Sequence, residues 1–170
     1  FWDYENGGFY QTKETSELPV RRKDLYDGAI PSGNSVMLLN LVRLSKLRGN
    51  TRYEELAWNL AEYFSASVKG SPHAYTMFLC GVGFAIGPSK EVVLVGEEND
   101  PETVALREKL NELFLPNTVI TLKTGEEDFI PEYALDLKRI ENQSTAYVCS
   151  NFVCNLPTTD PDEMEKLLKK

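Results

Sequence analysis

Apolar residues recur at helical spacing through the first half of the chain. Residues 34–48 carry leucines on more than one side, which predicts a buried helix. Residues 51–70 have one apolar face and open with Thr51 and Glu54, the T-x-x-E pattern of a capping box. Residues 71–87 open with Ser-Pro, a helix cap and a first-turn proline, and predict a third helix. Short turns between the three favour antiparallel hairpins.

Short β-branched runs replace this pattern in the second half. Three such runs, 91–95, 118–122 and 145–149, predict strands. A helical pattern over 100–114 lies between the first two, which predicts a strand–helix–strand unit with parallel strands. Residues 160–168 begin with Asp-Pro and predict a final helix.

The change of apolar period at residues 87–88 predicts two domains. Residues 1–88 should form a helical hairpin segment, preceded by loops or by a β-hairpin of 7–12 with 18–23. Residues 89–170 should form a small α/β domain with a three-stranded, mostly parallel sheet and helices. The expected fold class is mixed α/β.

Composition narrows the class of protein. The 170 residues are 42% hydrophobic and 26% charged, as in globular domains. The formal charge of −8 comes without a basic stripe, so no nucleic-acid partner is expected. The longest apolar stretch, 77–86, is too short for a bilayer, so we expect no membrane partner and a cytoplasmic location. The chain opens on Phe1 within an apparent fold, so we expect an excerpt from a longer protein, or a processed or renumbered product.

The cysteines and the loop after the first predicted strand do not match the motifs of redox, metal or nucleotide sites. Cys149 and Cys154 lack the C-x-x-C spacing of redox motifs, so we expect reduced thiols; the alternative is a reactive pair that docks a thioredoxin-like domain. Only His73 and Cys80 remain as soft ligands, so no metal is expected, and Cys80 is expected to be a buried hydrophobe. The GEENDP loop is acidic and holds one glycine, so no nucleotide cofactor is expected.

Polar and aromatic residues gather in the N-terminal segment and in the YDGAIPSGN loop. Sugars are bound by aromatic faces with carboxylates and amides, and pairs of carboxylates carry glycosidic acid–base chemistry. The candidate groups are the carboxylates Glu5, Asp24 and Asp27, the stacking rings Trp2 and Tyr4, and the sugar ligands Ser32 and Asn34. The alternative is that ENGG is a turn and the aromatic residues are core.

Several segments together resemble one family. They are GGFYQT, VRRKDLYDGAIPSGNS, LVRLSKLRGN, EVVLVG and AYVCSNFVCNLPTTDPDEMEKLL. In this order they resemble the thioredoxin-domain-containing proteins typified by bacterial YyaL and the mammalian spermatogenesis-associated thioredoxin-like protein. The resemblance implies a thioredoxin-like domain followed by an (α/α) toroid similar to six-hairpin glycosidases and N-acylglucosamine 2-epimerases. This chain would supply the last hairpins of an incomplete toroid and a terminal α/β piece.

Two functions remain open from the sequence. The first is carbohydrate binding or modification by the N-terminal loops. The second is a non-catalytic scaffold that docks onto the rest of the toroid and the thioredoxin-like domain. Convergence of Glu5, Asp24, Asp27 and Trp2 on one pocket would favour the first function, and separation would favour the second. The apolar first helix also predicts self-association through residues 34–64.

Overall fold

The chain folds into two compact units. The computed structural model describes residues 1–15, 17, 19–125 and 130–169. The first unit holds Phe1–Ser45 and Asn50–Ile86, and the second holds Lys46–Gly49 and Gly87–Lys170. No helix in the described ranges is long and apolar enough to cross a membrane.

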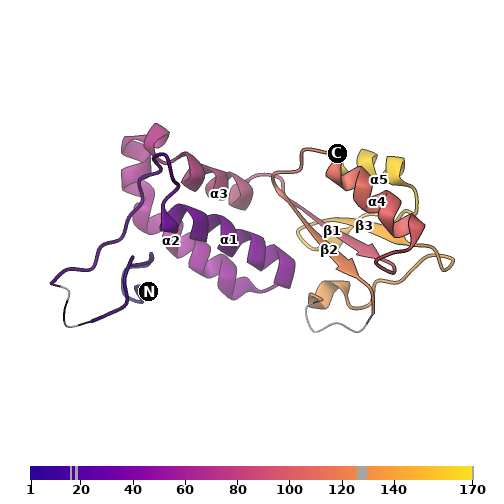
Figure 1. Ribbon diagram of the computed structural model, residues 1–170, viewed down its shortest axis with the longest axis horizontal. Helices are drawn as coiled ribbons and strands as arrows, with labels where there is room; N and C mark the ends of the chain where they lie inside the picture. The colour runs from indigo at the N-terminus through magenta and orange to yellow at the C-terminus, as the bar shows by residue number, and fades with distance from the viewer. Residues whose placement is uncertain (16, 18, 126–129, 170) are drawn as a thin grey trace. The chain divides into compact units, whose positions relative to one another are not determined.

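Helices dominate the first unit (Figure 1). They are α1 (Gly33–Arg48), α2 (Thr51–Gly70) and α3 (Thr76–Ile86), with the 3-10 turn η1 (Pro72–Ala74) between the last two. The predicted positions are confirmed, except that the Ser-Pro pair opens the short turn and not the third helix. The expected cap of α2 is also wrong: the side chain of Asn50, not of Thr51, accepts the Arg52 N–H at 2.9 Å.

Each of the three helices contributes buried apolar side chains. They are Leu38, Leu41, Val42, Ala57, Leu60, Phe64, Val68, Phe78 and Phe84. The expectation that the first helix is buried nearly all round is wrong, because Leu44 is exposed. Cys80 is also exposed, and not buried as expected. It lies two residues after the buried Phe78, which turns it to the outer side of α3.

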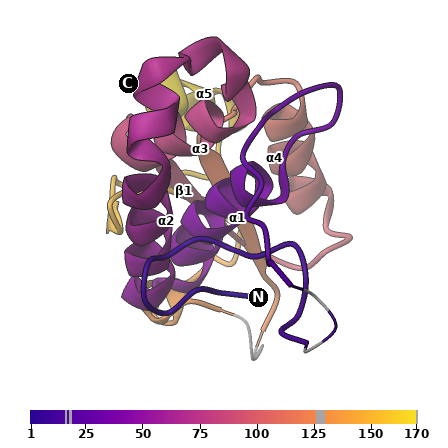
Figure 2. The same cartoon turned by 90° about the vertical axis from the view of Figure 1, so that its left-hand side faces the viewer.

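The N-terminal segment lies against α1 and α2 as a tight hairpin (Figure 2). Trp2 pairs with Phe9, and the Asp3 N–H donates to the Gly8 carbonyl at 2.9 Å. The predicted strands over 7–12 and 18–23 do not form in the described residues; one backbone bond from Gln11 to the Arg22 carbonyl joins these arms. Ser16, between these arms, and Leu18, in the second arm, lie outside the described residues.

The second unit is a sheet covered by helices. Its strands are β1 (Lys90–Val95), β2 (Thr118–Lys123), β3 (Thr145–Ser150) and β4 (Val153–Cys154), in the order β2-β1-β3-β4. The three predicted strands are present, and β4 adds a fourth. β1 pairs with β2 in parallel and with β3 antiparallel, so the sheet is mixed and not mostly parallel.

The connections explain this topology. The helix α4 (Pro101–Asn111) joins the parallel pair, as a crossover must. The described residues between β2 and β3 hold only the 3-10 turn η2 (Glu132–Ala134), so β3 starts at the edge where β2 ends and runs back.

The two faces of the sheet have different covers. One apolar layer joins the sheet to α4 and α5 (Pro161–Lys169) through Val92, Leu94, Leu106, Leu110, Ala146, Val148, Met164 and Leu168. Figure 1 shows both helices on the same side of the sheet. On the other face Val93 and Val95 pack with Ala134 of η2. The sheet is therefore buried on both faces over its central strand.

Candidate functional site

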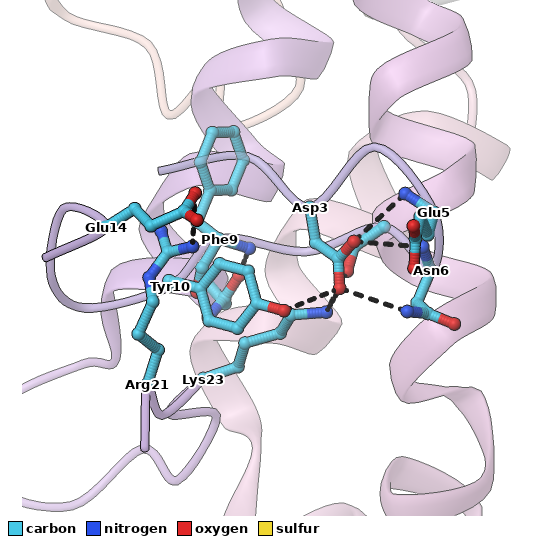
Figure 3. A network of polar contacts seen from close by, with 10 residues as sticks. Asp3, Glu5, Asn6, Phe9, Tyr10, Glu14, Arg21 and Lys23 are labelled. Carbon is cyan, nitrogen blue, oxygen red and sulfur yellow. Dashed lines mark hydrogen bonds and ion pairs between the residues drawn. The ribbon is translucent and has the colours of Figure 1, made fainter. Parts of the chain in front are cut away.

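Asp3 is the centre of the N-terminal polar cluster (Figure 3). Its carboxylate accepts hydrogen bonds from the Lys23 ammonium at 2.7 Å and the Tyr10 hydroxyl at 2.9 Å. It also accepts the backbone N–H of Glu5 at 3.0 Å and of Asn6 at 3.2 Å. The Asp3 and Lys23 side chains are both buried, so this is an ion pair shielded from water.

The charges of this cluster are mutually satisfied. The Lys23 ammonium holds the pKa of Asp3 well below its usual range, against the opposing effect of desolvation. The hydrogen bond to Asp3 raises the pKa of the Tyr10 phenol. Lys23 also donates to the Gly7 carbonyl at 2.5 Å and lies 3.9 Å from the ring centre of Tyr63. Asp3 therefore fixes the hairpin and has no spare position for substrate chemistry.

Sequence reasoning missed Asp3 as the key carboxylate. Its partner Lys23 lies 20 residues away, and no local pattern links the two positions. The only local signal is Asp3 before ENGG, since an Asp side chain often caps the turn that follows it.

Three of the predicted residues share one pocket of about 300 Å³, which we call the Trp2 pocket. It is lined by Trp2, Asp3, Tyr4, Glu5, Asn6, Gly7, Asn59, Glu62 and Tyr63. The Tyr4 side chain is 89% exposed, whereas the Trp2 ring packs edge-on against Phe9 with centroids 4.8 Å apart. Rings, amides and carboxylates thus meet at a surface that water reaches.

Asp24 and Asn34 lie elsewhere, at a pocket of about 560 Å³ that we call the Met37 pocket. Its lining is Phe1, Phe9, Tyr10, Gln11, Asp24, Gly33, Asn34 and Met37. The buried Asn34 amide accepts the Phe9 N–H at 2.7 Å and donates to the carbonyls of Phe9 and Asp24 at 3.0 and 2.7 Å. All three of these hydrogen bonds are to main-chain groups, so Asn34 anchors the N-terminal segment to α1.

Asp27 and Ser32 hold the YDGAIPSGN loop. The Asp27 carboxylate accepts the Ser32 N–H at 2.9 Å and the Phe78 N–H, in the first turn of α3, at 3.0 Å. The buried Ser32 hydroxyl donates to the Ser35 hydroxyl at 2.8 Å and accepts the Ser35 N–H. Asp27 therefore caps the N-terminus of α3, and Ser32 caps the N-terminus of α1.

The predicted carboxylates do not converge. Glu5 lines the Trp2 pocket, Asp24 lines the Met37 pocket, and Asp27 caps α3. Acid–base catalysis on a glycosidic bond needs two carboxyl groups flanking the same bond. The predicted set does not provide this arrangement.

The structure joins Cys149 and Cys154 in a disulfide. The expectation of two reduced thiols is wrong, because the chain brings their Cα atoms within 3.8 Å of each other. β3 and β4 form a tight hairpin whose turn residues Asn151 and Phe152 have φ of 50° and 64°. Because these two residues with positive φ reverse the chain, Cys149 and Cys154 lie opposite each other on the paired strands. Within the described ranges, no group of three or more potential metal ligands gathers.

Known proteins are similar to this chain over nearly its whole length. The chain is 34% identical to human spermatogenesis-associated protein 20 over 174 aligned residues, covering 99% of the chain and 22% of the human protein. The rat protein of the same name is 32% identical, with the same coverage. An uncharacterized protein from Caenorhabditis elegans, B0495.5, is 30% identical over 100% of the chain and 23% of its own length.

No family model and no solved structure matches the chain. The chain spans about a fifth of the length of the curated relatives it matches, since the alignments cover 22% or 23% of them. On these alignments, the chain belongs to the spermatogenesis-associated protein 20 family, the thioredoxin-domain-containing family that its motifs resemble.

Proposed function

We propose that the first unit is a non-catalytic interaction module, which packs against other parts of a longer family protein through α2 and α3. The observation that carries this proposal is an apolar pocket of about 440 Å³ between the two helices, the Trp58 pocket. It is lined by Trp58, Ala61, Glu62, Ser65, Val68, Lys69, Phe78, Leu79 and Val82.

Large apolar side chains at this pocket face water. Trp58 is 44% exposed and Leu79 is 38% exposed. Tryptophan in a pocket with a polar rim is typical of interfaces, and Glu62 and Lys69 supply such a rim here. The separation of Glu5, Asp24 and Asp27 supports the non-catalytic character.

The proposed occupant is an apolar helical surface of the remaining polypeptide. The relatives carry about four-fifths of their length outside the matching segment, because the alignments cover 22% of them. In the toroid that the resemblance implies, neighbouring helical hairpins pack side by side, and a helix of the adjacent hairpin would fill the Trp58 pocket.

Replacement of Leu79 tests this proposal. The chain is grafted in place of the matching segment of the human relative, and Leu79→Lys is made in the graft and in the isolated chain. The melting temperature of the isolated chain should change little, because Leu79 is already exposed. In the graft it should fall by about 4 °C or more, because a buried lysine opposes docking.

Ser67→Lys is the control, since Ser67 is exposed on α2 and does not line the pocket. It should leave both proteins unchanged. Equal effects of Leu79→Lys in the graft and in the isolated chain would overturn the proposal.

A second candidate function is carbohydrate binding at the Trp2 pocket. It is favoured by the meeting of Trp2 and Tyr4 with the amides of Asn6 and Asn59 and the carboxylate of Glu62. These are the groups that stack on sugar rings and hydrogen-bond their hydroxyls.

Titration of the isolated chain with neutral oligosaccharides, followed by NMR, tests this candidate. Tyr4→Ala should abolish the chemical-shift changes, because the exposed ring would stack on the sugar. Tyr26→Ala, an exposed tyrosine outside this pocket, should leave them unchanged. Shifts that survive Tyr4→Ala, or none at all from a full glycan set, would count against this function.

A further inference from the structure

A buried carboxylate lies beside the disulfide on one face of the sheet. Glu91 of β1 is directly opposite Cys149 of β3, and Cys149 is directly opposite Cys154 of β4. Opposite residues of antiparallel strands point to the same face, so the three side chains form one row across the sheet. Glu91 and Cys149 are both 0% exposed, whereas Cys154 is partly exposed.

Only one of the two Glu91 carboxylate oxygens accepts a hydrogen bond in the described structure. Oε2 accepts the Phe152 N–H at 3.1 Å and so supports the β3–β4 turn. Oε1 is buried and accepts no hydrogen bond from the described residues; it lies 3.4 Å from the ammonium of Lys46, which clusters with the second unit. A buried carboxylate is costly, so an oxygen left without a hydrogen bond calls for an explanation.

We propose that Cys149 and Cys154 form a thiol–disulfide exchange site for a dithiol substrate, with Glu91 carrying the proton of Cys149. Exchange requires one accessible sulfur for the incoming thiolate and a proton route for the sulfur that leaves. Cys154 supplies the first. Cys149 is sealed from water, so its proton needs a group inside the protein, and the Glu91 carboxylate is its neighbour across the strands.

The reaction has two steps. A substrate thiolate attacks Cys154 Sγ, the bond between Cys154 and Cys149 breaks, and Cys149 leaves as a thiolate that takes a proton through Glu91. The second substrate thiolate then attacks the substrate sulfur of the mixed disulfide, which closes the substrate disulfide and releases Cys154, protonated from water. Two electrons pass from the dithiol to the cysteine pair. In reverse, Glu91 accepts the Cys149 proton as that sulfur attacks the mixed disulfide.

Two further ionisable side chains, Tyr133 and Lys46, interact with Glu91. The Tyr133 ring lies 5.0 Å, centroid to centroid, from Phe152. Burial, and then the charge of Glu91, raise the pKa of the Tyr133 phenol, so it stays neutral. Within the part of the chain that the structure describes, the ammonium of Lys46 pairs with Glu91, and the phenol of Tyr133 lies close enough for the Glu91 charge to act on it.

The test follows exchange with dithiothreitol in a Cys80→Ser background, which removes the exposed free thiol. Reduced protein is mixed with oxidised dithiothreitol, quenched with a maleimide and analysed by mass spectrometry. Glu91→Gln should slow disulfide formation by about 100-fold or more at pH 7, the scale of general base catalysis. The defect should shrink above pH 9, where thiols ionise without help. Glu108→Gln, an exposed carboxylate, is the matched control.

A second comparison keeps the proposal falsifiable if Glu91→Gln does not fold. With oxidised glutathione, Cys149→Ser should form a mixed disulfide at Cys154 much faster than Cys154→Ser forms one at Cys149, because Cys154 is the accessible sulfur. Equal rates for the two variants would overturn the proposal. So would a folded Glu91→Gln protein that exchanges like the parent, or a disulfide that excess dithiothreitol does not reduce in the folded state.

Discussion

Asp3 and Lys23 form a buried ion pair that joins the N-terminal hairpin to the arm that follows it. The lowered pKa of Asp3 means that its ionised form stabilises the folded state. That stability is fully present above the unfolded pKa of about 3.9 and is lost as the pH falls toward the folded pKa. We predict that Asp3→Asn lowers the free energy of unfolding at pH 7, and that the difference from the parent narrows below about pH 4.

Urea unfolding at a series of pH values measures this difference. Glu17→Gln, at an exposed position of the same segment, serves as the control and should not alter the pH profile. A gap between Asp3→Asn and parent that stays constant from pH 7 to pH 3 would contradict the role given to this ion pair.

Gly7 is the second residue on which the hairpin depends. Its φ is +81°, and an added Cβ would lie 3.0 Å from the backbone oxygen of Asn59. We predict that Gly7→Ala costs about 1–2 kcal/mol, from left-handed backbone strain with further crowding against α2. Gly33→Ala, where a Cβ meets nothing within 4 Å, should be nearly neutral. Chemical denaturation of both variants gives the comparison, and an equal cost would refute it.

At the scale of elements, Asn34 links the N-terminal segment to the start of α1. Removal of its amide leaves a backbone N–H and two carbonyls without these partners. We predict that Asn34→Ala lowers the free energy of unfolding by about 2 kcal/mol or more. Asn40→Ala, at an exposed position of the same helix, should be neutral or slightly stabilising. Hydrogen exchange at Phe9 should rise in the first variant alone; unchanged protection would argue against the anchor.

The elements that sequence predicts are those with a strong local pattern. Residues 34–48 and 91–95 carry continuous apolar signals, and both form as predicted. The strand β4 has two residues, too few for any periodicity, and it forms because the Asn151–Phe152 turn places it beside β3. The same hairpin brings Cys149 and Cys154 together in a disulfide, where the sequence predicted reduced thiols.

The site residues show the limit of sequence reasoning more clearly. The types of side chain at Asp27, Ser32 and Asn34 suit a sugar site, yet each is used to hold backbone. Whether a polar side chain faces a ligand or the backbone depends on segments that are distant in sequence. The Asp27 carboxylate, for example, accepts the N–H of Phe78, which lies 51 residues away. The residue type predicts that a side chain can form hydrogen bonds, but it does not predict which group the side chain binds.

At the scale of the whole molecule, the first unit has a well-formed core and still exposes large apolar side chains. Trp58 and Leu79 lie at the Trp58 pocket on α2 and α3. The relatives contain far more polypeptide than this chain, which spans 22% of the human protein. The proposed interaction module accounts for both observations, because the rest of the polypeptide would cover this pocket.

The accessibility of position 79 tests this account most directly. Leu79→Cys is made in a Cys80→Ser background, and its reaction with N-ethylmaleimide is timed in the isolated chain and in the chain grafted into the human relative. Ser67→Cys, outside the pocket, should react at the same rate in both proteins. The account predicts that the Leu79→Cys thiol reacts rapidly in the isolated chain and roughly tenfold or more slowly in the graft, because a docked surface must open first. Equal rates in the two proteins would show that nothing covers the Trp58 pocket, and would contradict the account.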